Sequence, residues 1–230
     1  MIDGKPAQLG VSGTLWKDAL VMYDDVTGSM WSQVDGRAIV GPQRGARLRE
    51  LPAVQTTWAE WVRLHPDTRV LRKQGAARAG SRYEAYFKDP GRLGVLGSKA
   101  RDTRLPPKEV VIGLVLGGEA RAYPRSRLRA GAVVNDVVGG VPVLLAIHPS
   151  SGRVDVFKRA VAGRTLSFGA GAADSVKVQG GGELDLRNGR ISGGAEHGAV
   201  LERLAISQPF WFSWVAFHPK SSFWPGEERR

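Results

Sequence analysis

The sequence predicts a mainly β fold built from two pseudo-symmetric β-rich repeats, each ending in a short α-helix, with the first repeat truncated at its front. Three observations lead to this prediction. Residues 36–66 match residues 189–219 without a gap, and short apolar runs separated by glycine-rich turns fill most of the chain. The second repeat, 110–230, also has a front portion for which the first repeat, 1–71, has no counterpart.

The two matching segments keep a constant offset of 153 residues (36 to 189), and 13 of their 31 positions are identical. Similarity at a fixed spacing is typical of a duplicated supersecondary unit. The identical positions include two tryptophan pairs and a histidine pair, which are Trp58 with Trp211, Trp61 with Trp214, and His65 with His218. We therefore expect these six residues to have structural roles.

The strands of the second repeat are predicted from apolar and β-branched runs bounded by turn residues. Residues 110–116 and 120–123 flank Gly117-Gly118, a dipeptide typical of a two-residue hairpin turn. Residues 141–147 form a further apolar strand. Asn135-Asp136 and Gly139-Gly140, ahead of that strand, are interpreted as turn residues.

Each repeat is predicted to end in a short helix that stops before a proline. Thr57 and Glu60 have the spacing of a capping box, in which the hydroxyl accepts from the Glu60 N–H and the carboxylate reaches back to the Thr57 N–H. His65 and His218 then fall in the last helical turn. A cation is favoured there by the helix dipole.

Charge is distributed unevenly along a chain whose formal net charge is +11. Residues 37–129 carry twenty Lys and Arg against eight Asp and Glu, and they include a predicted basic connecting loop at 72–109. Such a region is usually a solvated face, and the alternative is a site for an acidic partner. Nucleic acid is not expected, because aromatic residues do not alternate with these cations.

Composition excludes several kinds of site. Cysteine is absent, which rules out disulfides, thiolate nucleophiles and zinc–thiolate centres within the chain. The longest apolar stretch, 140–147, is too short to cross a bilayer. The first residues read as a strand and turn, so no signal peptide is expected here. No cofactor is implied.

One cluster of residues is a candidate ligand-binding site. Met22, Asp24, Ser29, Trp31 and Gln33 surround one predicted hairpin, and the second repeat has a shorter stretch in the same place. Divergence at this point indicates that the first copy was retained for a purpose besides packing. The alternative is a hairpin whose methionine and tryptophan simply fill the core.

Several long motifs support a family resemblance: Leu9-Gly10-Val11-Ser12-Gly13, Leu20-Val21-Met22-Tyr23-Asp24, Thr27-Gly28-Ser29-Met30-Trp31-Ser32-Gln33, Gly118-Glu119-Ala120-Arg121-Ala122-Tyr123-Pro124 and Phe210-Trp211-Phe212-Ser213-Trp214. They resemble a bacterial family, domain of unknown function 3179, over nearly the whole chain. The resemblance implies an extracytoplasmic protein, usually with an export signal ahead of the domain. It implies no established activity.

Members of that family carry a Cys-Pro-Leu-Cys motif in the first copy, at a place that would fall ahead of Met1. The equivalent place in the second repeat is Ile147-His148-Pro149-Ser150-Ser151, which has no cysteine. His148 is therefore a weak candidate metal ligand. No metal site is otherwise predicted, because the four histidines form no HxH or HExxH pair.

Together these observations predict a non-catalytic binding or accessory module of an exported bacterial family, since no nucleophile–base or acid–base set can be assembled from the chain. Two alternatives remain open: an enzyme or metal carrier whose thiols lie in the absent front portion, and a basic module that binds an acidic partner. A truncated sheet would leave an edge and an apolar face uncovered. We therefore expect another chain, a second copy or the 72–109 loop to cover residues 1–40.

Overall fold

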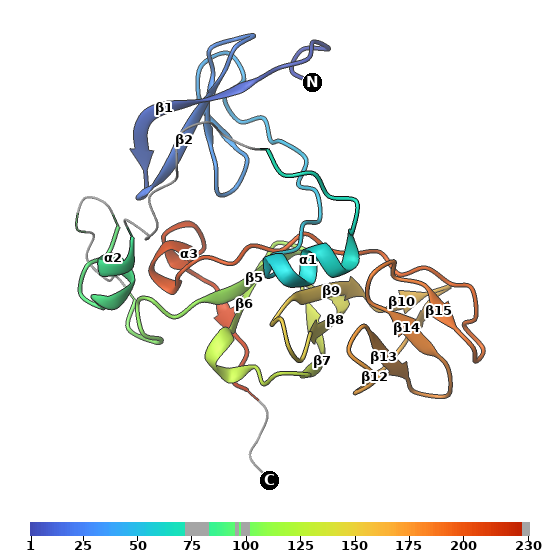
Figure 1. Cartoon of the computed structure of the whole chain (residues 1–230). Helices are drawn as coiled ribbons and strands as arrows, with labels where there is room; N and C mark the ends of the chain where they lie inside the picture. The colour runs from blue at the N-terminus through green and yellow to red at the C-terminus, as the bar shows by residue number, and fades with distance from the viewer. Residues whose placement is uncertain (72–82, 95–96, 98–101, 227–230) are drawn as a thin grey trace. The chain divides into compact units, whose positions relative to one another are not determined.

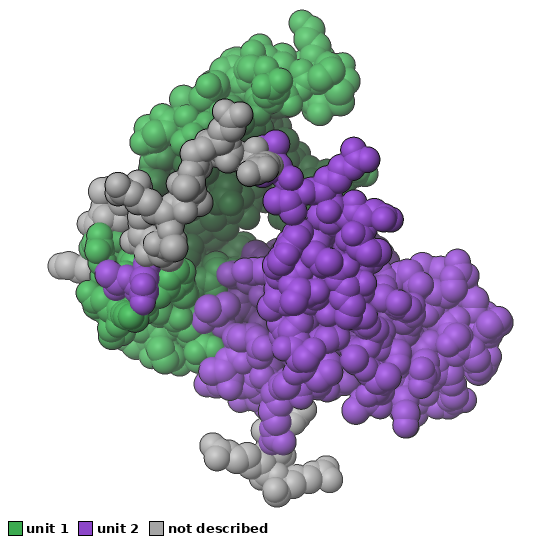
Figure 2. Space-filling view, in the orientation of Figure 1, with its two compact units in different colours: residues 1–51, 86–109, 209–220 green, residues 52–85, 110–208, 221–230 purple. Residues whose placement is uncertain are grey.

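The computed structural model describes residues 1–71, 83–94, 97 and 102–226. The chain is mainly β, as the sequence predicts, and it divides into two compact units (Figures 1 and 2). Unit 1 comprises residues 1–51, 86–109 and 209–220, and unit 2 comprises residues 52–85, 110–208 and 221–230. The segment with the first repeat's helix thus belongs to unit 2, and the segment with the second repeat's helix belongs to unit 1.

Unit 1 contains an antiparallel sheet in the order β1-β2-β3-β4, formed by β1 (Leu9–Trp16), β2 (Ala19–Asp24), β3 (Met30–Ser32) and β4 (Ala38–Val40). Lys17 and Asp18 join β1 to β2, with φ values of 51° and 62°. Positive φ at both central residues matches the right-handed twist of a two-residue hairpin. The sheet's core consists of Ile2, Trp31 and Ala38.

The outer strands of the unit 1 sheet, β1 and β4, carry exposed apolar side chains. Leu9, Val11 and Leu15 on β1 are exposed, as is Val40 on β4. Ile2, by contrast, is buried against the sheet's own core. Coverage of residues 1–40 by a partner therefore stays a prediction.

Unit 2 contains several short antiparallel sheets. Strands β7 (Val133–Val138), β8 (Val141–Ile147) and β9 (Val154–Lys158) form one of them. A second consists of β5 (Val111–Leu116) and β6 (Glu119–Pro124), with β16 (Ser222–Phe223) added in parallel to β6. The others are the β10 (Ala160–Val161) and β11 (Arg164–Thr165) pair, and the sheet of β12 (Phe168–Gly169), β13 (Ser175–Val178), β14 (Glu183–Asp185) and β15 (Ile191–Ser192).

Strand β8 is the centre of unit 2, because its two faces belong to different cores. Val143 and Leu145 pack with residues of β5, β6 and β9, whereas Leu144 and Ala146 pack with the β12–β15 sheet. Successive strand residues point to opposite faces, so a strand buried on both sides is apolar throughout. This explains the continuous apolar run at 141–147.

The helices are short. They are α1 (Trp58–Leu64) in unit 2, α3 (Trp211–Phe217) in unit 1, α2 (Glu84–Lys88) at the boundary between segments 52–85 and 86–109, and a 3₁₀ turn, η1 (Arg125–Arg127). Helix α2 lies in the predicted connecting loop 72–109, part of which is outside the described residues. No described helix is long and apolar enough to cross a membrane.

Local structure recurs at the offset seen in the sequence. Helices α1 and α3 begin at residues 58 and 211, and strands β3 and β14 begin at residues 30 and 183, so both pairs are 153 residues apart. The main-chain hydrogen bonds that follow β3 and β14 also correspond: Gly36 to Ser32 and Gly189 to Asp185, then Leu48 to Gly36 and Leu201 to Gly189. The two segments therefore share these hydrogen bonds and these starting points of their elements.

The structure confirms one local prediction and corrects another. Gly117 and Gly118 have φ values of 54° and 81°, which confirms the predicted turn. The turn interpretation of Asn135-Asp136 is wrong, because both residues lie within β7. The Asn135 side chain instead donates to and accepts from the Phe168 main chain, and Asp136 accepts from Tyr123 and Arg121. Polar residues can occupy this strand because these partners satisfy them.

Candidate functional site

The predicted ligand cluster lies on the β2–β3 hairpin of unit 1, and the structure brings three of its members together. The buried Asp24 carboxylate accepts from the Trp31 Nε1–H at 2.8 Å and from the Thr27 hydroxyl at 2.8 Å. It also accepts from the main-chain N–H groups of Val26 and Thr27, and the Thr27 hydroxyl contacts that of Ser29 at 2.7 Å. These side chains hold the turn closed.

The other two members contribute to the hairpin differently. Met22 is paired with Trp31 across β2 and β3 and packs on the unit 1 core. Gln33 is exposed and donates through its main-chain N–H to Leu20. Ligand binding by this cluster stays a prediction, since the Asp24 carboxylate already has partners within the hairpin.

Burial of the Asp24 carboxyl opposes its ionisation, but hydrogen bonds from Trp31, Thr27 and Val26 outweigh burial and lower its pKa from 3.8 to about 2. A depressed folded-state pKa stabilises the fold above the ordinary value, and this contribution is lost as pH falls through about 2. We therefore expect Asp24→Asn to be less stable than wild type at neutral pH. The difference should shrink as pH falls from near 4 towards 2.

Urea unfolding at several pH values measures this difference directly. A Thr27→Val variant lacks the hydroxyl that donates to Asp24, so carboxyl NMR titration should give a higher Asp24 pKa in it than in wild type. A gap between wild type and Asp24→Asn that is constant across the acid range would contradict the assignment.

A second cluster, in unit 2, was missed by the sequence reasoning apart from His148. Glu60 on α1, His148 after β8 and Asp174 before β13 place one ligand atom each within 4.8 Å of one another. His148 is 3% exposed, and its Nε2 lies 3.6 Å from Glu60 Oε1 and 3.7 Å from Asp174 Oδ1. Among the described residues, this Nε2 has no hydrogen-bond partner.

Two arginines already occupy the carboxylates of this cluster. Arg153 donates to Glu60 at 2.6 Å, to Asp174 at 3.0 Å and to Asp155 at 2.8 Å. Arg63 donates to Glu60 at 2.9 Å and to Asp174 at 2.6 Å. The hydrogen bond from Arg63 lowers the pKa of Glu60 despite burial. Burial opposes ionisation of Asp174, but its hydrogen bonds from Arg63 and Arg153 outweigh burial and lower its pKa below the ordinary value.

The donor chemistry of the cluster does not fit a metal ion. His148 Nδ1 accepts the main-chain N–H of Ser151 at 3.2 Å, so the proton of the neutral ring resides on Nε2. The lone pair that a metal would need at Nε2 is then absent. A divalent cation would also stand next to two guanidinium groups that share its carboxylate ligands. The Glu60, His148 and Asp174 cluster is therefore best described as an ion-pair network.

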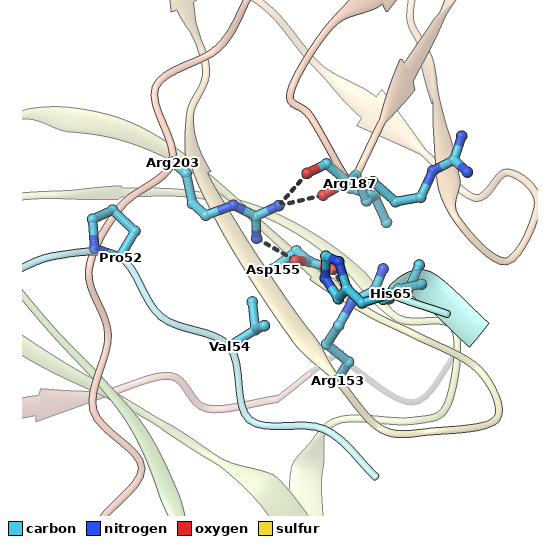
Figure 3. Close-up of a pocket in the computed structure, with 9 residues that line it drawn as sticks. Pro52, Val54, His65, Arg153, Asp155, Arg187 and Arg203 are labelled. Atoms are coloured by element: carbon cyan, nitrogen blue, oxygen red, sulfur yellow. Dashed lines mark hydrogen bonds and ion pairs between the residues drawn. The ribbon is translucent and has the colours of Figure 1, made fainter. Parts of the chain in front are cut away.

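A pocket of about 240 Å³ in unit 2 borders this network. Its lining combines apolar and charged residues, namely Pro52, Val54, Leu64, His65, Arg153, Asp155, Leu186, Arg187 and Arg203. Figure 3 shows Arg203 reaching towards Asp155 and towards the main-chain carbonyls of Leu186 and Arg187, whereas the Arg187 guanidinium points away. Arg203 also lies over the Phe157 ring, 4.6 Å from its centroid.

The repeated histidines lie at the C-caps of α1 and α3, one residue beyond each helix. Each ring packs on a tryptophan of its own helix, His65 on Trp61 at 4.3 Å and His218 on Trp214 at 4.2 Å between centroids. Burial lowers the pKa of His218, and Lys17 and Arg47 lower it further while Asp35 opposes them. The surroundings of His218 therefore favour the neutral ring, whereas a favourable effect of the helix dipole on a cation at this position stays a prediction.

The tryptophan pairs have the same positions on the helices and different environments. Trp211 and Trp214 on α3 are buried, whereas Trp58 on α1 is exposed and Trp61 is partly buried. The Trp61 Nε1–H donates to the Thr68 hydroxyl at 2.9 Å. A structural role is thus clearest for the two tryptophans of α3.

A family model described as protein of unknown function DUF3179 matches residues 1–221. No curated protein and no solved structure matches the chain. The match spans both units and the motifs that carry the resemblance. The chain therefore belongs to the DUF3179 family.

Proposed function

We propose that this chain is a non-catalytic binding module, and that the pocket of unit 2 binds a small carboxylate with an apolar body. The pocket itself is the observation that supports this proposal. Its volume of about 240 Å³ lies just below the range of pockets for drug-sized ligands, which favours a small ligand.

The walls of the pocket have the composition expected of a small-molecule site. Pro52, Val54, Leu64 and Leu186 provide an apolar surface, and a small number of polar groups accompany it. Apolar burial supplies most of the affinity in such pockets, and the polar groups fix the orientation of the ligand. The body of the ligand is therefore assigned to this wall.

Arg203 and His65 are the groups available to a carboxylate. Arg203 shares Asp155 with Arg153, so one carboxylate serves two guanidinium groups in the lining. Its Nη atoms are occupied by Asp155 and main-chain carbonyls, and its Nε–H makes no hydrogen bond within the described part of the chain. The His65 ring is exposed at the same pocket. A charge-assisted bond to Arg203 Nε would orient the ligand.

The proposal predicts that benzoate binds more tightly than benzamide, since benzamide has the same ring and lacks the charge. Isothermal titration calorimetry compares the two. A Val54→Trp variant, which fills the pocket, should abolish benzoate binding. Val70→Trp places the same side chain at an exposed position of unit 2 outside the pocket lining, and it should bind as wild type does.

Unchanged benzoate affinity in Val54→Trp would show that the ligand binds elsewhere. Equal affinities for benzoate and benzamide would show that Arg203 does not select a carboxylate. Loss of binding in both tryptophan variants would point to a general defect in unit 2 and would contradict assignment to this pocket.

We also propose that the two halves of the chain are copies of one ancestral unit, the first lacking its front. Identical residues at a constant offset support this, as do the matching hydrogen bonds after β3 and β14. Helices α1 and α3 also begin and end at equivalent positions of the two copies, and in each a histidine packs on a tryptophan of the same helix.

An extracytoplasmic location in a bacterium follows from the family resemblance and is part of the proposal. So is a protein partner, or a second copy, at the exposed β1 strand of unit 1, where Leu9, Val11 and Leu15 are exposed. Light scattering tests the second copy, and cell fractionation of the full gene product tests the location.

A further inference from the structure

A hairpin in unit 1, here called the arginine hairpin and comprising residues 36–49, carries four exposed arginines and no acidic residue. They are Arg37, Arg44, Arg47 and Arg49. The hairpin contains β4 and folds back so that Leu48 N–H donates to Gly36 and Ala38 N–H donates to Ala46. All four cations therefore extend from one short, hydrogen-bonded element.

The fold does not require this charge, as a second hairpin of the same backbone shows. Residues 189–202 in unit 2 make the corresponding bonds, from Leu201 to Gly189 and from Ile191 to Ala199. Their formal charge is −1, from Arg190 against Glu196 and Glu202, whereas the arginine hairpin has +4. The positions of Arg44, Arg47 and Arg49 are occupied there by His197, Val200 and Glu202.

The positions of the cations in the arginine hairpin do not stabilise the fold of the isolated protein. Arg37 and Arg47 face each other across an antiparallel bridge, where like charges are destabilising, whereas the second hairpin pairs Arg190 with Val200. Within the described residues none of the four arginines forms an ion pair, although Asp35 and Glu50 flank the hairpin. Arg47 donates to the Asp35 main-chain carbonyl at 3.4 Å.

Exposed apolar side chains accompany these cations. Val40 within the hairpin is 58% exposed, and Leu51, two residues after Arg49, is 65% exposed. We propose that the arginine hairpin binds the surface of an anionic lipid membrane. The arginines pair with lipid phosphates and carboxylates, and Val40 and Leu51 enter the interface. A nucleic acid would instead favour aromatic residues between the cations, and residues 36–49 contain none.

The test is co-sedimentation of the protein with lipid vesicles. Vesicles containing roughly one-third phosphatidylserine should bind it, and pure phosphatidylcholine vesicles should not, because each arginine contributes about fivefold to the partition coefficient. Binding should fall with added salt, as expected of surface electrostatics. Equal partition onto both vesicle types would overturn the proposal.

A matched variant uses the residues of the second hairpin, Arg44→His, Arg47→Val and Arg49→Glu. Since unit 2 carries these residues on the same backbone, the triple variant should fold, and it should lose about 100-fold in partition onto the anionic vesicles. Arg190→Gln removes the arginine of the second hairpin and should leave partition unchanged. An Arg37→Gln/Arg47→Gln variant, expected to lose about 25-fold, gives a second measure if the triple variant unfolds.

Undiminished vesicle binding by both hairpin variants would overturn the assignment to this hairpin. Binding to duplex DNA or to polyglutamate without binding to anionic vesicles would overturn the assignment of the partner. These outcomes are separate from those of the benzoate experiment, because the hairpin belongs to unit 1 and the pocket to unit 2.

Discussion

Replacing Arg153 with Met should lower the free energy of unfolding by about 3–5 kcal/mol, because it removes the buried cation that Glu60, Asp155 and Asp174 share. Arg153 is 2% exposed and donates to Glu60, Asp155 and Asp174, which come from three separate parts of the chain. Methionine has a similar length and no charge. The loss therefore reports the buried carboxylates of Glu60 and Asp155, each left with a single partly exposed arginine, more than a loss of packing.

Arg164→Met is the matched control, since Arg164 also pairs with a glutamate, Glu196, but is 62% exposed. Exposed ion pairs contribute little, so this variant should lose less than about 1 kcal/mol. Chemical denaturation measures both variants. A double variant, Arg153→Met with Glu60→Gln, should recover part of the loss by removing one of the buried charges that Arg153 pairs with. Equal losses for Arg153→Met and Arg164→Met would show that the network is hydrated in solution.

Much of the local structure could be predicted from the sequence, because it depends on neighbouring residues. The β8 run and the Gly117-Gly118 turn follow from apolar patterning and from the conformations open to glycine. The Thr57 cap of α1 follows from the same kind of local rule, and its hydroxyl does accept from Glu60 N–H. The Glu60 carboxylate, however, accepts from Arg63 and Arg153 rather than reaching back to Thr57.

The ion-pair network could not be predicted, because it depends on residues far apart in the chain. Glu60 and Arg153 are separated by 93 residues, and no local pattern pairs them. One signal was available: Arg153 and Asp155 alternate with Val154 and Val156, which places two charges on one face of a strand. Charges at alternating positions are typical of a solvent-exposed face, and the structure buries both Arg153 and Asp155.

The candidate cluster at Asp24 shows a different limit. Its members were chosen for their chemistry, and the structure does place Asp24, Ser29 and Trp31 together. A sequence does not show whether a carboxylate's hydrogen bonds are made within the protein or kept for a ligand. In the structure, Trp31, Val26 and Thr27 direct four donors at Asp24, and these hydrogen bonds are made within the protein because they form the turn itself.

Truncation of the two helix-initial tryptophans should have very different effects despite their equivalent positions in the sequence. Trp211 is fully buried, and its Nε1–H donates to Asp102 at 3.3 Å. Trp58 is 58% exposed. Trp211→Ala should cost about 3–5 kcal/mol of unfolding free energy, as large aromatic truncations in cores do. Trp58→Ala should stay within about 1 kcal/mol of wild type, as most surface substitutions do.

Chemical denaturation followed by circular dichroism measures both variants, with each serving as the control for the other. Both substitutions remove the same side chain from the first residue of a seven-residue helix. The change in helix propensity and the effect on the unfolded chain therefore contribute equally to both losses of unfolding free energy, and they cancel when the two losses are compared. The remaining difference is the burial of the indole in the folded protein. A loss at Trp58 as large as that at Trp211 would show that Trp58 is covered in solution, and it would locate a contact surface on α1.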